Sequence, residues 1–218
     1  MPAPEHRAQV MTGIGLRAHK GGAVVVCVTI AAGEPRTILS TVLETSAAGD
    51  RISLEPYQIA AEMPRGPQGG ASIEASAKVA EGRRRQEQLA TRGLQAIIDQ
   101  LALTGHKPGM VALLVNRAGW ITDLVGYSLA WAEHVPVAEA LAVRDALRFA
   151  SGECGIPLTE LDEKSLPDLA GEMFGKSSAE IAVQLNALGA SMGKPWRKEQ
   201  KLACLSAWVA MTRQHGYP

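Results

Sequence analysis

The chain has little cysteine, no excess of either charge and no long apolar run, and each absence excludes a class of protein. Its three cysteines, Cys27, Cys154 and Cys204, lie far apart and form no Cys-x-x-Cys pair. This pattern argues against a disulfide framework and against a cysteine zinc site. Lys plus Arg and Asp plus Glu number 22 each. No global charge therefore directs the chain to nucleic acid or anionic lipid, and any such binding has to be local.

The sequence also lacks a segment suited to a membrane. Its longest stretches without a charged residue, Gly21–Gly33 and Ile181–Gly193, are shorter than the roughly 20 apolar residues that a membrane span needs. The first ten residues contain no apolar run of the kind found in secretory signals. We expect a soluble, cytoplasmic protein with no membrane partner.

Three β-strands are predicted at the start of the chain, organised around a hairpin in Thr12–Ile30. The hairpin turns at His19–Gly22, and the strand after the turn is almost continuously apolar and β-branched. Such a run is typical of a strand that is covered on both faces. Strands joined by short turns form an antiparallel meander. We expect the three strands at Met11–Ala18, Ala23–Ala31 and Thr37–Thr45.

The rest of the chain alternates helices with two further strands. Ser72 is a suitable N-cap for the longest helix, which runs to Thr104 and is closed by Gly105. The apolar run at Met110–Val115 is typical of a buried parallel strand. The other expected elements are a short helix within Ile52–Met63, a helix at Val137–Ser151, a strand at Ile156–Leu161, and helices that begin at Ser165, Ser177 and Pro195. We interpret residues 1–10 as a flexible arm and residues 11–218 as a single domain.

This order of elements predicts an α/β fold with a mixed five-stranded sheet, three antiparallel strands followed by parallel strands, flanked by helices. It resembles the ribonuclease H-like fold, which ribonucleases H, Holliday-junction resolvases, transposases and sugar-kinase or actin-like ATPases share. The stretches 18–23 (AHKGGA), 144–147 (RDAL) and 194–208 also resemble uncharacterised bacterial families of hypothetical proteins with this resolvase-like topology. The resemblance covers most of the chain and implies a fold rather than an activity.

The resemblance also implies where metal-binding acids would stand: on the first strand, at the end of the fourth strand and on the last helix. Phosphodiester cleavage by metal ions needs several such carboxylates around one or two divalent cations. Here the first strand carries Arg17, the fourth ends in Asn116 and Arg117, and the last helix offers Glu199. We therefore expect no metal cofactor. The alternative is a divergent Mg²⁺-dependent nuclease or phosphoryl hydrolase that uses Glu139 and Glu199 as catalytic acids.

Two local patterns favour structural roles over functional ones. The segment AGEMFGKS at 170–177 lacks the first glycine of a phosphate-binding loop, whereas Ser177 and Glu180 fit a helix capping box. On the helix that contains Glu139, Asp145 lies about 120° away around the axis, so the two do not share a face. Asp145 is better placed to pair with Arg148, three residues on.

The start of the last helix is unusually basic. Lys194, Arg197 and Lys198 cluster there against the single acid Glu199. A helix N-terminus already carries partial positive charge, and a terminus surrounded by cations suits phosphate or carboxylate. The competing interpretation is a basic surface in which Trp196 is a packing residue.

The leading hypothesis is a non-catalytic binding protein with a cleft for an anionic group, either on a small molecule such as a phosphate or nucleotide or on a nucleic-acid backbone. The expected anion-binding residues are Arg17, His19, Lys194, Arg197 and Lys198. The nuclease or hydrolase is the second hypothesis. The third is a structural subunit in which the segment Trp120–Trp131 forms a homodimer contact.

Overall fold

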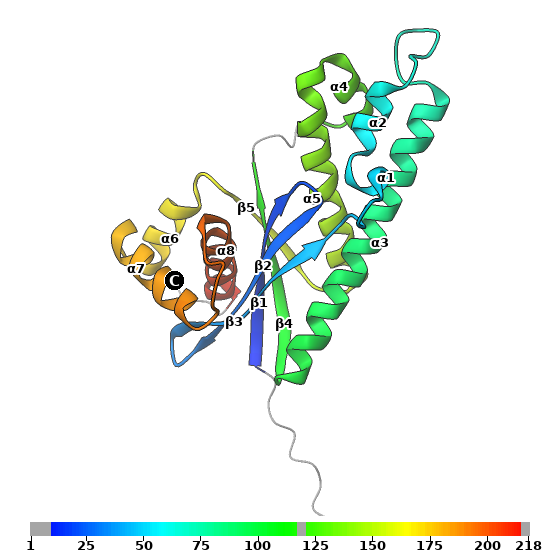
Figure 1. The fold of residues 1–218 in the computed structure, drawn as a ribbon. Coiled ribbons are helices and arrows are strands. Elements are labelled where there is room, and N and C mark those ends of the chain that lie inside the picture. The colour runs from blue at the N-terminus through cyan, green and yellow to red at the C-terminus, as the bar shows by residue number, and fades with distance from the viewer. Residues whose placement is uncertain (1–9, 117–120, 215–218) are drawn as a thin grey trace, which may run out of the picture.

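The computed structural model describes residues 10–116 and 121–214, which form a five-stranded sheet with helices on both faces (Figure 1). The strand order is β3-β2-β1-β4-β5. The first three strands pair antiparallel, β4 lies parallel to β1, and β5 lies parallel to β4. The predicted fold class is therefore confirmed. The strands are β1 (Val10–His19), β2 (Gly22–Ala31), β3 (Glu34–Glu44), β4 (His106–Val115) and β5 (Leu158–Asp162). Of the predicted arm, only Val10 lies within the described residues, and it begins β1.

Helices cover both faces of the sheet and create two cores. On one face lie α3 (Ile73–Leu103) and α5 (Val135–Glu153); on the other lies α8 (Lys198–Gln214), with α6 (Leu166–Phe174) and α7 (Ser178–Ala190) beside it (Figure 1). Successive side chains of a strand point to opposite faces. Along β2, the core on the α3 and α5 side receives Ala23, Val25 and Cys27. The core on the α8 side receives Val24, Val26 and Val28. The apolar run of β2 thus serves two cores, as predicted.

Two glycines of β1 allow α8 to approach the sheet closely. A Cβ atom at Gly15 would lie 1.8 Å from the carbonyl oxygen of Ala203, and one at Gly13 would lie 3.0 Å from that of Ala207. Later residues of β1 therefore meet earlier residues of α8. Because α8 runs antiparallel to β1, its first turn lies at the edge of the sheet where β1 ends.

The last helix begins later than predicted. It starts at Lys198, three residues after Pro195, whose peptide bond with Lys194 is cis. The backbone N–H of Arg197 donates to Oε1 of Gln200 (3.0 Å). In many helices the side chain of the third residue accepts a hydrogen bond from the backbone N–H of the N-cap residue, as Gln200 does here. The helix therefore begins directly after Arg197, and the prediction that Pro195 opens it is wrong.

The segment expected to hold one short helix forms two, α1 (Arg51–Leu54) and α2 (Pro56–Glu62). Glu55 separates them with φ −147° and ψ 58°. A residue before proline is disfavoured in the helical conformation, which explains the break. Two more short helices, α4 (Leu124–Ala130) and the 3₁₀ helix η1 (Ala132–His134), precede α5.

Two of the three predicted serine caps are confirmed. The hydroxyl of Ser72 accepts from the N–H of Ala75 (3.1 Å), and Ser177 forms a complete capping box with Glu180. Ser165 precedes α6 but does not cap it. Its hydroxyl instead donates to Oδ1 of Asp162, the last residue of β5 (3.2 Å).

Candidate functional site

The carboxyl ends of β1, β4 and β5 meet at one edge of the sheet, because these three strands run in the same direction. Ligand sites of open α/β sheets occur at this edge. Arg17 of β1 makes a two-pronged ion pair there with Glu163, the residue after β5. Its Nε donates to Oε2 (3.1 Å) and its second terminal nitrogen to Oε1 (3.0 Å). Arg17 is therefore held in place, and most of its charge is neutralised.

Arg144 of α5 reaches the same edge. One of its terminal nitrogens donates to Oδ1 of Asn116, the residue after β4 (2.9 Å). Its Nε is buried and has no hydrogen-bond partner, and no carboxylate of the described chain lies within ion-pair distance. Burial lowers the pKa of the guanidinium, and the nearby charge of Arg148 lowers it further. Arg144 is thus a half-buried cation whose hydrogen-bonding capacity is only partly used.

A polar cavity of about 450 Å³ opens beside Arg144. Arg148 on its wall pairs with Asp145 (2.7 Å) and with Glu160, and Arg83 from α3 pairs with the same Asp145 (3.0 Å). The pairing of Asp145 with Arg148 was predicted. The charged side chains of the lining are three arginines and two acids, namely Arg83, Arg144, Arg148, Asp145 and Glu160. The cavity therefore has a net positive charge, carried by Arg144.

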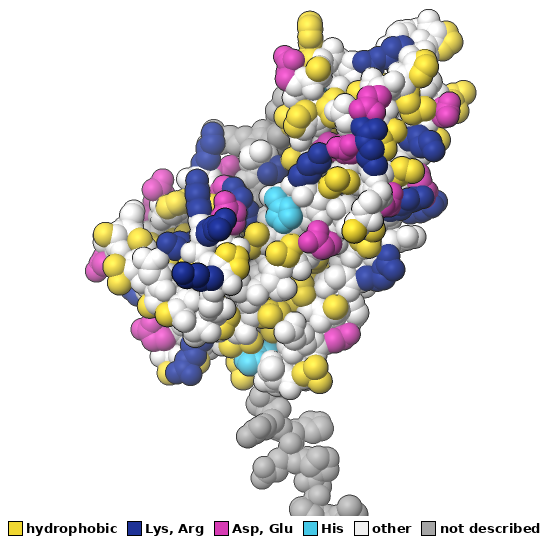
Figure 2. All heavy atoms as spheres, viewed as in Figure 1, with side chains coloured by type: hydrophobic (Ala, Val, Ile, Leu, Met, Phe, Trp, Pro, Cys, Tyr) yellow, Lys and Arg dark blue, Asp and Glu magenta, His cyan; other side chains and the backbone are white. Residues whose placement is uncertain are grey.

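The basic residues at the start of α8 lie at this edge too, because α8 runs antiparallel to β1. Lys194, Arg197 and Lys198 are all exposed, and Figure 2 shows Lys and Arg side chains gathered around the position that α8 occupies in Figure 1. His19 is exposed at the end of β1, and its Nδ1 donates to the carbonyl oxygen of Lys20 (2.9 Å). The five predicted anion-binding residues thus share an edge, but Arg17 already has a carboxylate partner.

Trp196 packs as the competing interpretation of this region expected. Its Nε1 donates to the carbonyl oxygen of Leu185 in α7 (2.9 Å), and a Cβ at Gly189 would lie 2.3 Å from the indole ring. The indole therefore anchors the segment before α8 to α7. The exposed cations around it are free to face solvent.

The two candidate catalytic acids lie on helices that cover opposite faces of the sheet. Glu139 of α5 is buried, and its Oε1 accepts the backbone N–H groups of Tyr57 (2.8 Å) and Gln58 (2.9 Å) at the start of α2. Burial raises its pKa to about 7. Glu199 lies in the first turn of α8, on the other face. The structure does not bring the two acids together, and Glu139 acts as a cap for α2.

The donor set at the carboxyl edge can be tested for its fit to a divalent metal. Within residues 10–116 and 121–214, no three side chains of His, Cys, Asp or Glu are grouped so that they could hold a metal ion. Two acids lie at the end of β5. Oδ1 of Asp162 accepts from the backbone N–H and the hydroxyl of Ser165, and both oxygens of Glu163 accept from Arg17. These residues suit an anion better than a cation.

Sequence reasoning missed the partner of Arg17 and the half-buried position of Arg144 on the cavity wall. Glu163 could have been noticed as an acid directly after a parallel strand. Arg144 is the tenth residue of a mostly apolar helix, where an arginine facing the sheet edge is a signal of a polar site. Of the predicted oligomer contact, Trp131 is 64% exposed, whereas Trp120 lies outside the described residues. The homodimer stays a prediction.

The fold is that of the ribonuclease H-like α/β proteins, of the type found in RuvC. A structure of Thermus thermophilus RuvC in complex with Holliday junction substrate superposes with a TM-score of 0.53 at 10% identity, covering 95% of this chain and 97% of that one. A second T. thermophilus RuvC structure gives 0.51 at 12% identity, covering 95% and 98%. No protein-family model and no curated protein matches the sequence. The resemblance to families of hypothetical bacterial proteins therefore stays an expectation. Across the described segments, no helix is long and apolar enough to cross a membrane.

Proposed function

We propose that this chain binds the phosphate backbone of DNA at the carboxyl edge of its sheet and does not cleave it. The observation that carries the proposal is Arg144, a guanidinium that lines a polar cavity without a carboxylate partner in the described chain. A guanidinium presents a planar fork of donors that matches two oxygens of a phosphate. Arg144 uses one terminal nitrogen on Asn116, which fixes the fork, and its Nε is buried. The other terminal nitrogen is left to donate to a ligand.

The surroundings of Arg144 support a backbone rather than an isolated anion. Lys194, Arg197 and Lys198 extend positive charge along the same edge, on exposed side chains that can follow a strand of phosphates. The chain as a whole is neutral, so binding to DNA has to rely on a local basic patch. This edge supplies such a patch. The RuvC fold is compatible with such a surface, since one RuvC structure contains a Holliday junction.

Among residues 10–116 and 121–214, this edge shows no group of three acids that could hold a metal ion for cleavage. Metal-assisted phosphodiester hydrolysis needs converging carboxylates that hold cations beside the scissile bond. β1 supplies a guanidinium, and β4 is followed by an amide. Of the two acids at the end of β5, Asp162 accepts from Ser165 through Oδ1, and Glu163 is bound through both oxygens by Arg17. Such an arrangement can hold a phosphate in place but offers no group of acids to assemble metal ions around it.

Fluorescence anisotropy with a labelled four-way DNA junction, and with a duplex of the same sequence, tests the proposal. Replacing Arg144 with Gln should weaken binding by about tenfold, because a charge-assisted hydrogen bond contributes about 1.5–3 kcal/mol. Arg92→Gln on α3 makes the same chemical change at an exposed site and should leave the affinity unchanged. Replacing Arg197 and Lys198 together should also reduce the salt dependence of binding. Equal affinities for the wild type and the Arg144 variant would refute the assignment.

The second candidate is the metal-dependent nuclease or phosphoryl hydrolase. Glu199 favours it, because this acid lies in the first turn of α8 at the carboxyl edge of a RuvC-type fold. Calorimetry with MgCl₂ or MnCl₂ decides between the candidates. We expect no saturable metal binding and no nicking of a labelled junction. A site that disappears in Glu199→Ala but persists in the control Glu172→Ala, together with metal-dependent nicking, would establish the nuclease.

A further inference from the structure

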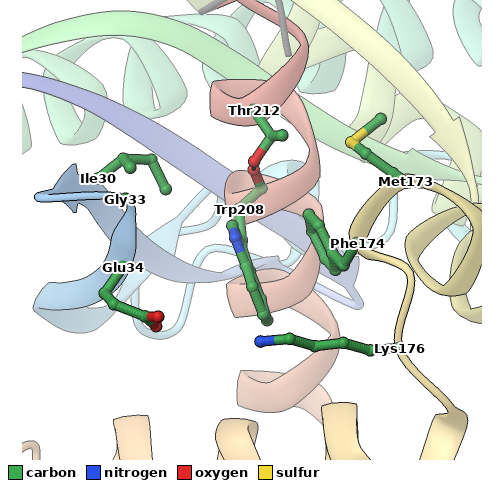
Figure 3. Close-up of a pocket in the computed structure, with 8 residues that line it drawn as sticks. All are labelled: Ile30, Gly33, Glu34, Met173, Phe174, Lys176, Trp208 and Thr212. Carbon is green, nitrogen blue, oxygen red and sulfur yellow. Dashed lines mark hydrogen bonds between the residues drawn. The ribbon is translucent and has the colours of Figure 1, made fainter. Parts of the chain in front are cut away.

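A second cavity lies at the opposite edge of the sheet from Arg144. It has a volume of about 500 Å³, within the range of small-molecule sites. Three parts of the chain that are distant in sequence form it: the turn between β2 and β3, the end of α6 together with Lys176, and the second half of α8 (Figure 3). Because β2 is antiparallel to β1, this turn lies where β1 begins. The cavity is separate from the proposed DNA site.

The walls of this cavity are flat and apolar. Phe174 stacks on Trp208 with ring centres 4.0 Å apart and planes inclined by 14°. Ile30 from β2 and Met173 from α6 complete the apolar lining, and Figure 3 shows Trp208 between Phe174 and the β2–β3 turn. Aromatic side chains arranged in this way favour a planar ligand, because stacked and edge-to-face contacts both require flat surfaces.

The polar groups of the cavity are held in fixed positions by one amide. Oε1 of Gln184, from α7, accepts from Nζ of Lys176 (2.6 Å), and its Nε2 donates to Oε2 of Glu34 (3.1 Å). The ammonium and the carboxylate are thereby fixed at one end of the cavity, and their charges cancel. The indole Nε1–H of Trp208 has no acceptor among the described residues, so it adds a further donor.

We propose that this cavity binds a small, uncharged heteroaromatic molecule that carries both hydrogen-bond acceptors and donors on its edge, the chemistry of a purine base. The acceptors face Lys176 and the indole N–H, and a donor faces the free oxygen of Glu34. An anionic ligand would meet the Glu34 carboxylate, and a cationic one would meet the Lys176 ammonium. The neutral lining therefore selects a neutral ligand.

Calorimetric titration of the full chain with adenosine tests the proposal, with benzoate and benzamidine as planar ligands of opposite charge. Adenosine should give saturable binding at least about tenfold tighter than either charged ligand. Lys176→Met, which keeps an apolar chain beside Trp208, and Glu34→Ala should each weaken adenosine binding by about tenfold. The neighbouring exposed Glu172→Ala is the matched control and should bind as the wild type does.

Three results would overturn the assignment: no saturation with adenosine, equal or tighter binding of benzoate or benzamidine, or wild-type affinity in both cavity variants. Glu34 is exposed and Lys176 is half-buried, and circular dichroism verifies that their variants fold. Since none of the residues tested lies at the carboxyl edge, failure here leaves the junction-binding result of Arg144→Gln unaffected. Likewise, failure of the junction-binding experiment leaves the adenosine result unaffected.

Discussion

Replacing Gly15 with alanine is expected to lower the free energy of unfolding by about 3 kcal/mol, the upper part of the range for overpacking a core. The new methyl group would lie 1.8 Å from the carbonyl oxygen of Ala203 and 2.8 Å from Oγ of Ser206. Neither the backbone of α8 nor that of β1 can yield locally, so the helix has to shift away from the sheet. Urea denaturation followed by circular dichroism measures the loss.

Two companion variants separate this clash from a general effect of adding a methyl group. Gly13→Ala brings the methyl closest to Cγ of Met211 (2.5 Å), a flexible side chain that can move aside, so its loss should be smaller. Gly152→Ala, in the last turn of α5, meets no atom within 4 Å and should stabilise by up to about 1 kcal/mol through helix propensity. A Gly15→Ala protein as stable as the wild type would show that α8 does not pack against β1 in this way.

Glu139 is expected to make the protein less stable as the pH rises from about 4.5 to about 7. Its pKa is near 7 in the folded state, raised by burial from the ordinary value of 4.5. Between these values the folded state binds more protons than the unfolded state, so stability falls with increasing pH and levels off above pH 7. The full change corresponds to about 3 kcal/mol. Chemical denaturation at a series of pH values measures it.

The variant Glu139→Gln isolates this contribution from other titrating groups. The glutamine oxygen can still accept the N–H groups of Tyr57 and Gln58, but the side chain no longer titrates. Relative to the wild type, the variant should gain about 2–3 kcal/mol between pH 5 and pH 8. A constant difference across this range would mean that Glu139 ionises normally and that α2 is not capped by a buried acid.

The fold could be predicted from the sequence because the patterns that specify its strands and helices are local. The apolar run of β2, the breaker-rich turns and the Ser72 and Ser177 caps each depend on residues a few positions apart. The error at the start of α8 comes from weighing two local signals wrongly. Gln200 accepts the backbone N–H of Arg197 and marks that residue as the N-cap, whereas the prediction relied on Pro195 as the first helical residue.

The candidate site could be predicted only in part, because its geometry depends on strand order. The sequence places Arg17 on the first strand and an acid after the fifth, but only the β1-β4-β5 order brings Arg17 and Glu163 together. Glu139 illustrates the same limit. Its helical neighbours could be predicted, whereas its bonds to α2 connect segments that are remote in sequence.

The packing of α8 against the glycines of β1 also affects how the protein is made. β1 ends at His19, whereas its partner helix spans residues 198–214 and is therefore synthesised much later. At ordinary rates of synthesis, roughly ten seconds or more separate the two. During that interval the apolar side chains of β2 and β4 that α8 later covers, among them Val26, Val28 and Leu114, have no helix over them. An incomplete chain therefore exposes apolar surface of the kind that makes partly folded proteins prone to aggregation.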